Sequence, residues 1–278
     1  MRTLLLPALV ALVAASAAAA AGGSTGSVER AQGGQYRGTP YFAVLCGFSH
    51  RNQDDPIVYP NQPNRSHDHT YFGNTSTKAS STPASLRASG QTTCRPRADT
   101  AAYWAPTLFV RGDPVAPRYA VAYYVRRSVD PVRPFPAGLK MIAGNAMARA
   151  PQDARVTFWS CGEQSISSSV PTCVSAAGRS ALRLTVSFPD CWDGRRLDSA
   201  DHKSHMASST GGRCPASHPV AVPGLVLVIQ YPVEGGSAAE LASGGDFSGH
   251  ADFVNAWDQR TLAALVDRYL NRTGFRLP

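Results

Sequence analysis

The sequence lacks the motifs of several large enzyme classes. It has no P-loop, no H-E-x-x-H motif, no G-x-G-x-x-G turn after a predicted strand, and no serine elbow between a strand and a helix. In other proteins these motifs hold nucleotide phosphates, a catalytic zinc ion, a dinucleotide or an activated serine. Their absence argues against nucleotide-dependent, zincin and α/β-hydrolase chemistry.

Lysine is scarce. Only Lys78, Lys140 and Lys203 occur among the 27 basic residues, against 19 acidic ones. The arginines are scattered, and their dense groups are pairs such as Arg195–Arg196. A nucleic-acid-binding protein concentrates basic residues on one element, so we expect no nucleic-acid partner. We interpret the net charge of +8 as one that keeps the protein soluble. The alternative is that it attracts the protein weakly to anionic cell-wall polymers or acidic glycans.

Long apolar runs are absent after the first 21 residues. Arg2, an apolar run from Leu4 to Val13 and an Ala/Ser tract to Ala21 are typical of a secretory signal peptide over residues 1–21. The run is shorter than the roughly 20 apolar residues that span a membrane. We expect residues 22–40 to form a flexible lead-in, residues 41–278 to form a single domain, and the mature protein to be secreted without membrane contact.

The six cysteines favour disulfides in an oxidising compartment. They can pair in 15 ways, and the sequence alone does not choose. Pairing cysteines that are close in the sequence, so that each disulfide closes a short loop, favours Cys161–Cys173 and Cys191–Cys214. This leaves Cys46–Cys94 as the third pair. A structural zinc site is the alternative, but the sequence has no C-x-x-C pair to support it.

Short segments rich in β-branched and aromatic residues predict strands. One late stripe of apolar residues predicts a helix over 259–271, with Asp258 as its N-cap and Gly274 after its end. We expect a mainly β protein, a single-domain β-sandwich or jelly-roll-like architecture with long loops and one C-terminal helix. Residues 74–92 and 161–180 are predicted surface loops. The predicted strands are 41–48, 107–111, 119–125, 140–143, 156–160, 182–188 and 225–231.

Most of the seven histidines fall into three groups with nearby carboxylates. His67 and His69 would share a face of an extended strand. His202 and His205 are spaced as neighbours on a helical turn, and His250 precedes Asp252 by two residues. Converging imidazoles suit one divalent metal ion or one substrate, and the carboxylates could orient them. The candidate ligands of a metal are His67, His69, His202, His205 and His250, and the candidate orienting or acid/base carboxylates are Asp198, Asp201 and Asp252.

A second set of residues has the chemistry of sugar recognition. Trp192 offers a flat ring for stacking, and Asp193 offers oxygens for hydroxyl groups. Tyr103, Asn255 and Trp257 are further candidates for substrate contact. The alternative for each aromatic residue is a place in the core.

Several of these segments together resemble one known family. Asp55-Pro56-Ile57-Val58, the Ser66–His69 and Phe72–Asn74 segments, the Leu197–Met206 segment and the Gly249–Asp258 segment occur in order. This pattern is similar to the DUF1996 family of extracellular domains of fungi and bacteria, over about residues 42–262. Fungal members are often joined to WSC carbohydrate-binding modules, which implies work at cell walls or plant polymers. The resemblance implies a site at the histidine and aspartate positions, but it implies no reaction.

Three hypotheses follow. The first is a secreted enzyme acting on extracellular polysaccharide through a His/Asp-rich, metal-assisted pocket, as a hydrolase or a lyase. The second is a non-catalytic protein that binds a glycan with the same residues. In the third, the histidines and aspartates only pin long loops. Convergence of the histidine groups in space separates the first two hypotheses from the third, and turnover separates the first from the second.

Overall fold

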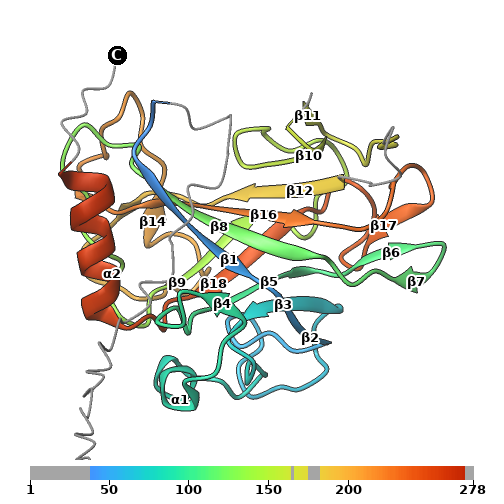
Figure 1. Ribbon diagram of the computed structural model, residues 1–278, viewed down its shortest axis with the longest axis horizontal. Helices are drawn as coiled ribbons and strands as arrows, with labels where there is room; N and C mark the ends of the chain where they lie inside the picture. The colour runs from blue at the N-terminus through green and yellow to red at the C-terminus, as the bar shows by residue number, and fades with distance from the viewer. Residues whose placement is uncertain (1–37, 164–165, 175–181, 273–278) are drawn as a thin grey trace, which may run out of the picture.

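The computed structural model describes residues 38–163, 166–174 and 182–272. The predicted signal peptide, nearly all of the predicted lead-in and Gly274 lie outside these residues. Eighteen strands in the described residues form four antiparallel sheets. The two larger sheets, with seven and five strands, make up most of the fold (Figure 1). The prediction of a mainly β architecture is confirmed.

The seven-stranded sheet is built around the apolar strand β16, which is buried along almost its whole length. Next to it, β12 alternates in part: Leu182, Leu184 and Val186 are buried and Arg183 and Ser187 are partly exposed, but Thr185, which would share their face, is buried as well. In spatial order the sheet comprises β11 (Ile166–Ser167), β10 (Thr157–Cys161), β12 (Leu182–Ser187), β16 (Gly224–Gln230), β8 (Tyr119–Val125), β1 (Tyr41–Cys46) and β4 (Cys94–Arg95).

The five-stranded sheet contains three strands that the sequence patterns did not predict, β3, β5 and β18. Each is buried on both faces, so none shows the alternation of a half-exposed strand. In spatial order the sheet comprises β2 (Phe48–Asn52), β3 (His69–Gly73), β5 (Ala102–Pro106), β18 (His250–Val254) and β9 (Lys140–Gly144).

Two three-stranded sheets extend these layers. One carries the cysteine- and histidine-rich segment and comprises β14 (Met206–Ala207), β13 (Cys191–Trp192) and β15 (Val220–Ala221). The other comprises β17 (Ala239–Leu241), β6 (Leu108–Val110) and β7 (Asp113–Pro114).

The main core lies between the two larger sheets. Phe42 and Leu227 of the seven-stranded sheet share one apolar cluster with Phe72, Tyr103 and Phe253 of the five-stranded sheet. Fully burying an aromatic or leucine side chain contributes about 1.5–3 kcal/mol. This cluster is therefore what holds the sheets face to face, as in a sandwich.

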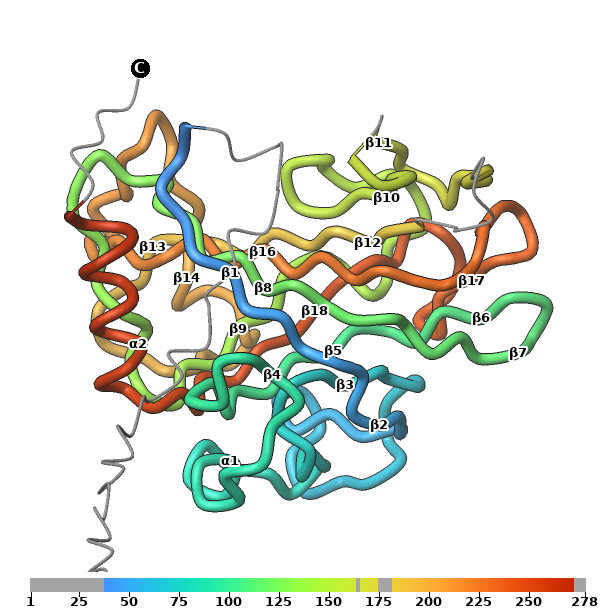
Figure 2. The backbone as a smooth tube through the Cα atoms, viewed as in Figure 1, coloured from blue at the N-terminus to red at the C-terminus, as the bar shows by residue number. Residues whose placement is uncertain are grey.

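A second, smaller core covers the other face of the five-stranded sheet. Tyr71 of β3 and Trp104 of β5 pack there against Ile57 and Leu86. Leu86 belongs to α1 (Pro83–Ser89), which begins at a capping box between Thr82 and Ser85. The prediction of an irregular loop over 74–92 is wrong at this point. The segments around α1 gather beside β2 and β3 (Figure 2).

The C-terminal helix begins as predicted. Asp258 accepts a hydrogen bond from the Thr261 backbone N–H at 2.8 Å, and α2 (Gln259–Leu265) continues into a π-helical turn, η2 (Val266–Asn271). The buried stripe consists of Leu262, Val266 and Leu270 and faces the main core. No helix in the described ranges is long and apolar enough to span a membrane.

The cysteines form the three pairs that their closeness in the sequence favours. The disulfides are Cys46–Cys94, Cys161–Cys173 and Cys191–Cys214. The first joins β1 to β4, the second closes the predicted loop that begins at Cys161, and the third ties β13 to the turn before β15. Three disulfides are compatible with an extracellular protein.

A buried carboxyl group sits between the sheets. Asp99 accepts hydrogen bonds from the Tyr103 hydroxyl at 2.7 Å and from the Ala101 N–H at 3.0 Å. Tyr103 also contacts the Tyr124 hydroxyl, which accepts from the Trp257 indole. Burial raises the pKa of Asp99 to about 7.

This raised pKa predicts a pH-dependent stability. The folded state holds the Asp99 proton between about pH 4 and 7, whereas the unfolded chain releases it near pH 4. The stability of the wild type relative to Asp99→Asn should fall by up to about 1.4 kcal/mol per pH unit through that window and level off above it. Chemical denaturation of both proteins from pH 4 to 9 measures this difference. A difference that is constant or rises with pH contradicts the assignment.

Candidate functional site

Three imidazoles meet at the edge of the second core. His69 is the first residue of β3, His67 lies two residues before it, and His250 is the first residue of β18. The ring centroids are 4.3 Å apart for His67 and His69, 5.0 Å for His67 and His250, and 6.0 Å for His69 and His250. One nitrogen from each ring lies within 4.8 Å of the other two. The first and third histidine groups therefore converge.

Strand register explains this meeting. His69 is opposite Pro106 in the β3–β5 pair. Asp252 is opposite Trp104 in the β5–β18 pair, and continuing that register by two residues places His250 at the level of Pro106. The two histidines thus flank one residue of β5 from either side. Both point away from the main core, because side chains alternate along each strand.

Hydrogen bonds fix which nitrogen of each buried ring is free. His69 donates from Nδ1 to the Asp54 carbonyl at 2.9 Å, and His250 donates from Nδ1 to the Ser248 carbonyl at 2.8 Å. A carbonyl can only accept, so both rings carry the proton on Nδ1 and a lone pair on Nε2. The Nε2 atoms of His67 and His69 are buried and have no hydrogen-bond partner among the described residues. This is the second-shell arrangement of metal-binding histidines.

Two buried carboxylates lie beside the rings. Asp55, His69 and Asp252 form a second group whose potential ligand atoms lie within 4.8 Å of one another. Oδ2 of Asp252 is 4.0 Å from Nε2 of His250 and has no hydrogen-bond partner in the described chain. Asp55 accepts from the Ile57 and Val58 N–H groups through Oδ1 alone. The site thus combines imidazole nitrogen and carboxylate oxygen donors.

Burial sets the protonation of these groups. It lowers the pKa of His67 to about 4 and that of His250 to about 3, and it lowers the pKa of His69 well below its usual value. The three rings are therefore neutral at pH 7 and keep their lone pairs. Burial raises the pKa of Asp55, and burial together with the nearby Asp55 carboxylate raises the pKa of Asp252 well above its usual value.

The second histidine group borders this cluster without joining it. Lys203 donates to the Gly144 carbonyl at 2.6 Å, and its charge lowers the pKa values of His250 and Asp252. His202 is bonded to Asp198 at 2.8 Å, and Asp198 also pairs with Lys140 at 3.1 Å. Lys203 therefore places a positive charge beside the three imidazoles.

His205 and Asp201 are engaged in hydrogen bonds within their own segment and to β9. His205 is fully buried, and its nitrogens contact the Ser199 hydroxyl at 2.9 Å and the Lys140 carbonyl at 2.7 Å. No lone pair remains for a metal. Asp201 accepts from the Ser199 hydroxyl and the Ser204 N–H and stabilises a turn. These bonds lower its pKa, so it stays ionised.

Three of the predicted substrate contacts are also interior. Tyr103, Asn255 and Trp257 have no exposed surface, so they offer no face to a ligand. Asn255 donates to the Phe135 and Pro136 carbonyls at 3.0 and 2.8 Å. Trp192 is half-buried, and its indole donates to the Arg196 carbonyl at 2.6 Å. Asp193, the remaining candidate, pairs with Arg196 at 2.7 Å.

Comparison with known proteins gives a family. The model of DUF1996, a domain of unknown function, matches residues 55–257, which is most of the chain. This chain belongs to the DUF1996 family. No curated protein and no solved structure matches it. The match begins at Asp55. It includes all five residues that form the site, which we call the His/Asp cluster: Asp55, His67, His69, His250 and Asp252.

Two residues of this DUF1996 site were not among the sequence-based candidates. Asp55 lies 14 residues before β3 in an irregular segment, and only its place in the family pattern marked it. Gly144 is opposite His250 in the β9–β18 pair and has a φ of +84°. A Cβ at Gly144 would lie 2.4 Å from the Gly249 carbonyl oxygen and 2.8 Å from the Cα of His250.

Gly144 therefore provides a test of the site's backbone. We expect Gly144→Ala to lower the free energy of unfolding by about 3 kcal/mol, because it adds overpacking to backbone strain. Gly112→Ala is the matched control: its φ is also +84°, but no atom lies within 4 Å of an added Cβ. It should cost only about 1 kcal/mol. Urea denaturation compares the two, and equal losses would contradict the close approach.

Proposed function

We propose that this protein is a secreted, metal-dependent enzyme that acts on extracellular polysaccharide in a hydrolase- or lyase-like reaction. His67, His69 and His250 hold one divalent transition-metal ion, and Asp252 lies within reach as a further ligand or a base. One observation carries the proposal: three neutral imidazoles each place a nitrogen within 4.8 Å of the other two, and the Nε2 atoms of His67 and His69 and Oδ2 of Asp252 are buried without a hydrogen-bond partner among the described residues. Secretion is supported by the signal-like N-terminus and the three disulfides.

The donor set selects the class of metal. Imidazole nitrogen suits zinc, copper, iron and nickel, whereas magnesium and calcium prefer sites made of oxygen. Three histidines holding zinc leave a fourth position open for water or substrate, as in catalytic rather than structural zinc sites. A metal ion at this position would polarise a bound water or a substrate oxygen.

The surrounding residues supply the remaining chemistry. Asp252 and Asp55 are buried carboxyl groups with raised pKa values, which suits proton transfer near neutral pH. His67 is the one partly exposed ring of the three, so a substrate would approach from its side. The ammonium group of Lys203 is beside the cluster and would attract negative charge on the substrate.

A second candidate function is favoured by the burial of the donors. The Nε2 atoms of His67 and His69 have almost no exposed surface, as expected for a metal that stabilises structure. In that case the protein would bind a glycan without turnover. The ion would link β3 to β18 across β5, which lies between them. Metal binding is common to both candidates, and turnover separates them.

Metal binding is the first prediction of this proposal. The purified protein should bind one equivalent of Zn²⁺, and His67→Ala should weaken the affinity more than tenfold, since losing a ligand exceeds the roughly 10–100-fold effect of outer-shell changes. His67 is partly exposed, so this variant should fold. Isothermal titration with Zn²⁺ and elemental analysis measure both quantities.

His218→Ala is the matched control for that titration. His218 is partly exposed and is bonded to the Ser217 hydroxyl and the Ser204 carbonyl, away from the cluster. Its loss should leave the stoichiometry and the affinity unchanged. A wild-type protein that binds no zinc, cobalt or copper, or a His67→Ala variant that binds as tightly as the wild type, would remove the metal centre.

Turnover is the second prediction. The metal-loaded protein should release reducing ends or unsaturated products from a panel of cell-wall polysaccharides, and removal of the metal should abolish this activity. Asp252→Asn should lower kcat by about 100-fold or more, as loss of a general base does, while Zn²⁺ still binds. Glycan binding without any product in the metal-loaded wild type would establish the second candidate instead.

A further inference from the structure

A separate concave region lies on the small sheet β14–β13–β15. It consists of two adjoining depressions of about 470 and 360 Å³, which share Ala216 and Pro219 as a common wall. Neither depression is lined by a residue of the His/Asp cluster. Arginine is the recurring charged residue in their walls: Arg195, Arg196, Arg133 and Arg213.

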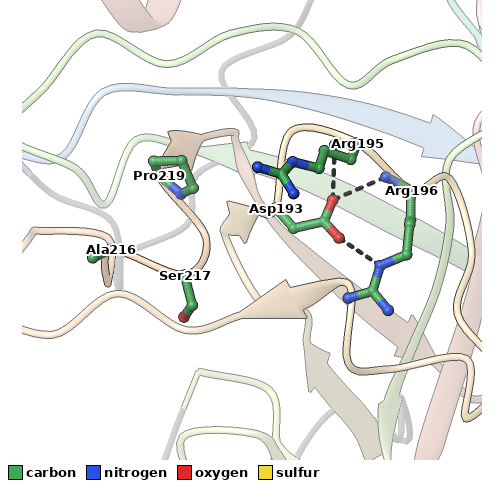
Figure 3. A pocket seen from close by; sticks show the side chains of 6 residues that line it. All are labelled: Asp193, Arg195, Arg196, Ala216, Ser217 and Pro219. Atoms are coloured by element: carbon green, nitrogen blue, oxygen red, sulfur yellow. Dashed lines mark hydrogen bonds and ion pairs between the residues drawn. The ribbon is translucent and has the colours of Figure 1, made fainter.

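In the first depression one arginine is left without a counter-charge. Asp193 accepts from the backbone N–H groups of Arg195 and Arg196 at 2.8 and 2.9 Å, and from Nε of Arg196 at 2.7 Å (Figure 3). These bonds lower the pKa of Asp193 to about 2. The carboxylate is thus occupied by the turn and by Arg196. The guanidinium of Arg195 has no hydrogen-bond or ion-pair partner in the described part of the chain.

The second depression repeats this pattern. Arg133 and Arg213 are exposed, and neither side chain has a hydrogen-bond or ion-pair partner among residues 38–163, 166–174 and 182–272. Asp130 is the acidic residue in the walls of this depression. Counting Arg195, Arg133 and Arg213 against Asp130 leaves an excess of positive charge, because Arg196 and Asp193 neutralise each other.

The walls are held by short covalent and hydrogen-bonded links. Cys214 is joined to Cys191 of β13, and Val220 and Ala221 of β15 line the second depression. Arg133 donates its backbone N–H to the Ala221 carbonyl at 2.8 Å. Pro131, Pro215 and Pro219 restrict the backbone further. These links constrain the backbone at Arg133 and next to Arg213.

We propose that Arg195, Arg133 and Arg213 form a binding site for an acidic polysaccharide, distinct from the imidazole cluster. Guanidinium groups bind carboxylates and sulfates through paired hydrogen bonds, and an elongated pair of depressions fits a chain with repeated anionic groups. Ser217 and Asp130 can bond sugar hydroxyls. No aromatic residue lines either depression, whereas single-stranded nucleic acid is bound by stacking on aromatic rings.

The evidence for an anion-binding site is the set of arginines in the two depressions. The choice of a polysaccharide as the anion rests on the proposed function. The test is therefore carried out in EDTA, so that the metal centre plays no part. Fluorescence anisotropy of a labelled oligogalacturonate is titrated with the full protein at about 0.15 M salt, where charges more than about 8 Å apart are largely screened. We expect R195Q/R213Q to bind about tenfold or more weakly than the wild type, since two charge-assisted pairs are lost.

The matched control is R87Q/R118Q, which removes the same charge at two other exposed arginines outside the depressions. It should change the affinity by no more than about twofold, because exposed distant charges are screened by salt. Equal weakening in the two double variants would show general charge attraction and overturn the site. Undiminished binding by R195Q/R213Q would overturn it as well.

Two further probes test the class of ligand. A labelled sulfated oligosaccharide should bind with the same dependence on Arg195 and Arg213 if sulfate is the natural anion, and more weakly than oligogalacturonate if carboxylate is. A neutral oligoglucan should not bind, and single-stranded DNA of equal charge should bind more weakly than the glycan. Tighter binding of the DNA, or equal binding of the neutral chain, would contradict the proposal.

Discussion

The register of β18 between β5 and β9 determines where His250 and Asp252 of the site lie. His250 and Asp252 share the face that meets the second core, while Ala251 and Phe253 enter the main core. A slip of one residue would exchange the two faces. The aromatic ring of Phe253 in the main core therefore specifies the position of His250, and Gly144 allows the two strands to approach closely at the end of the pair.

The same constraint places polar atoms where water does not reach them. Each buried polar atom without a partner costs about 1–3 kcal/mol, and His67, His69 and Asp252 each have one. A chain with two apolar cores and three disulfides can tolerate this cost. A cation held by His67, His69 and His250 would contact the two unpaired imidazole nitrogens at once, so its binding would be coupled to the stability of the folded state. A polar cluster that served only to pin loops would instead pair its own atoms, as His205 does with Ser199 and Lys140.

The sequence predicted those elements that carry a clear local pattern. The strand over Tyr119–Val125 and the helix beginning at Gln259 have the expected bounds, because β-branched residues or a helical apolar stripe mark them. The strands β3, β5 and β18 were not predicted as strands, since each is buried on both faces and lacks the alternation of a half-exposed strand.

The site was predictable to a similar degree. Spacing by two residues identified His67, His69, His250 and Asp252, because β-strands preserve that spacing as a shared face. The spacing of His202 and His205 carried no such information: a turn places the first ring near the cluster and directs the second into the interior. Asp55 lies in an irregular segment, and long-range packing alone brings it to Asp252. Likewise, no local pattern distinguishes Trp257 in the core from an aromatic residue on the surface.

The segment from Cys191 to Met206 links the two regions of the molecule that we assign to substrate. Its first half carries Arg195 at the arginine-lined depressions, and its second half carries Lys203 at the imidazole cluster. Two of the three lysines of the chain, Lys140 and Lys203, belong to this second region. Under the proposed function, one repeating feature of the substrate would serve both: a carboxylate can pair with a guanidinium or an ammonium group and can also ligate a metal ion. A neutral polymer offers only hydroxyl groups and would leave Arg195, Arg213 and Lys203 without a counter-charge. The cationic residues of both regions therefore favour acidic over neutral polysaccharides.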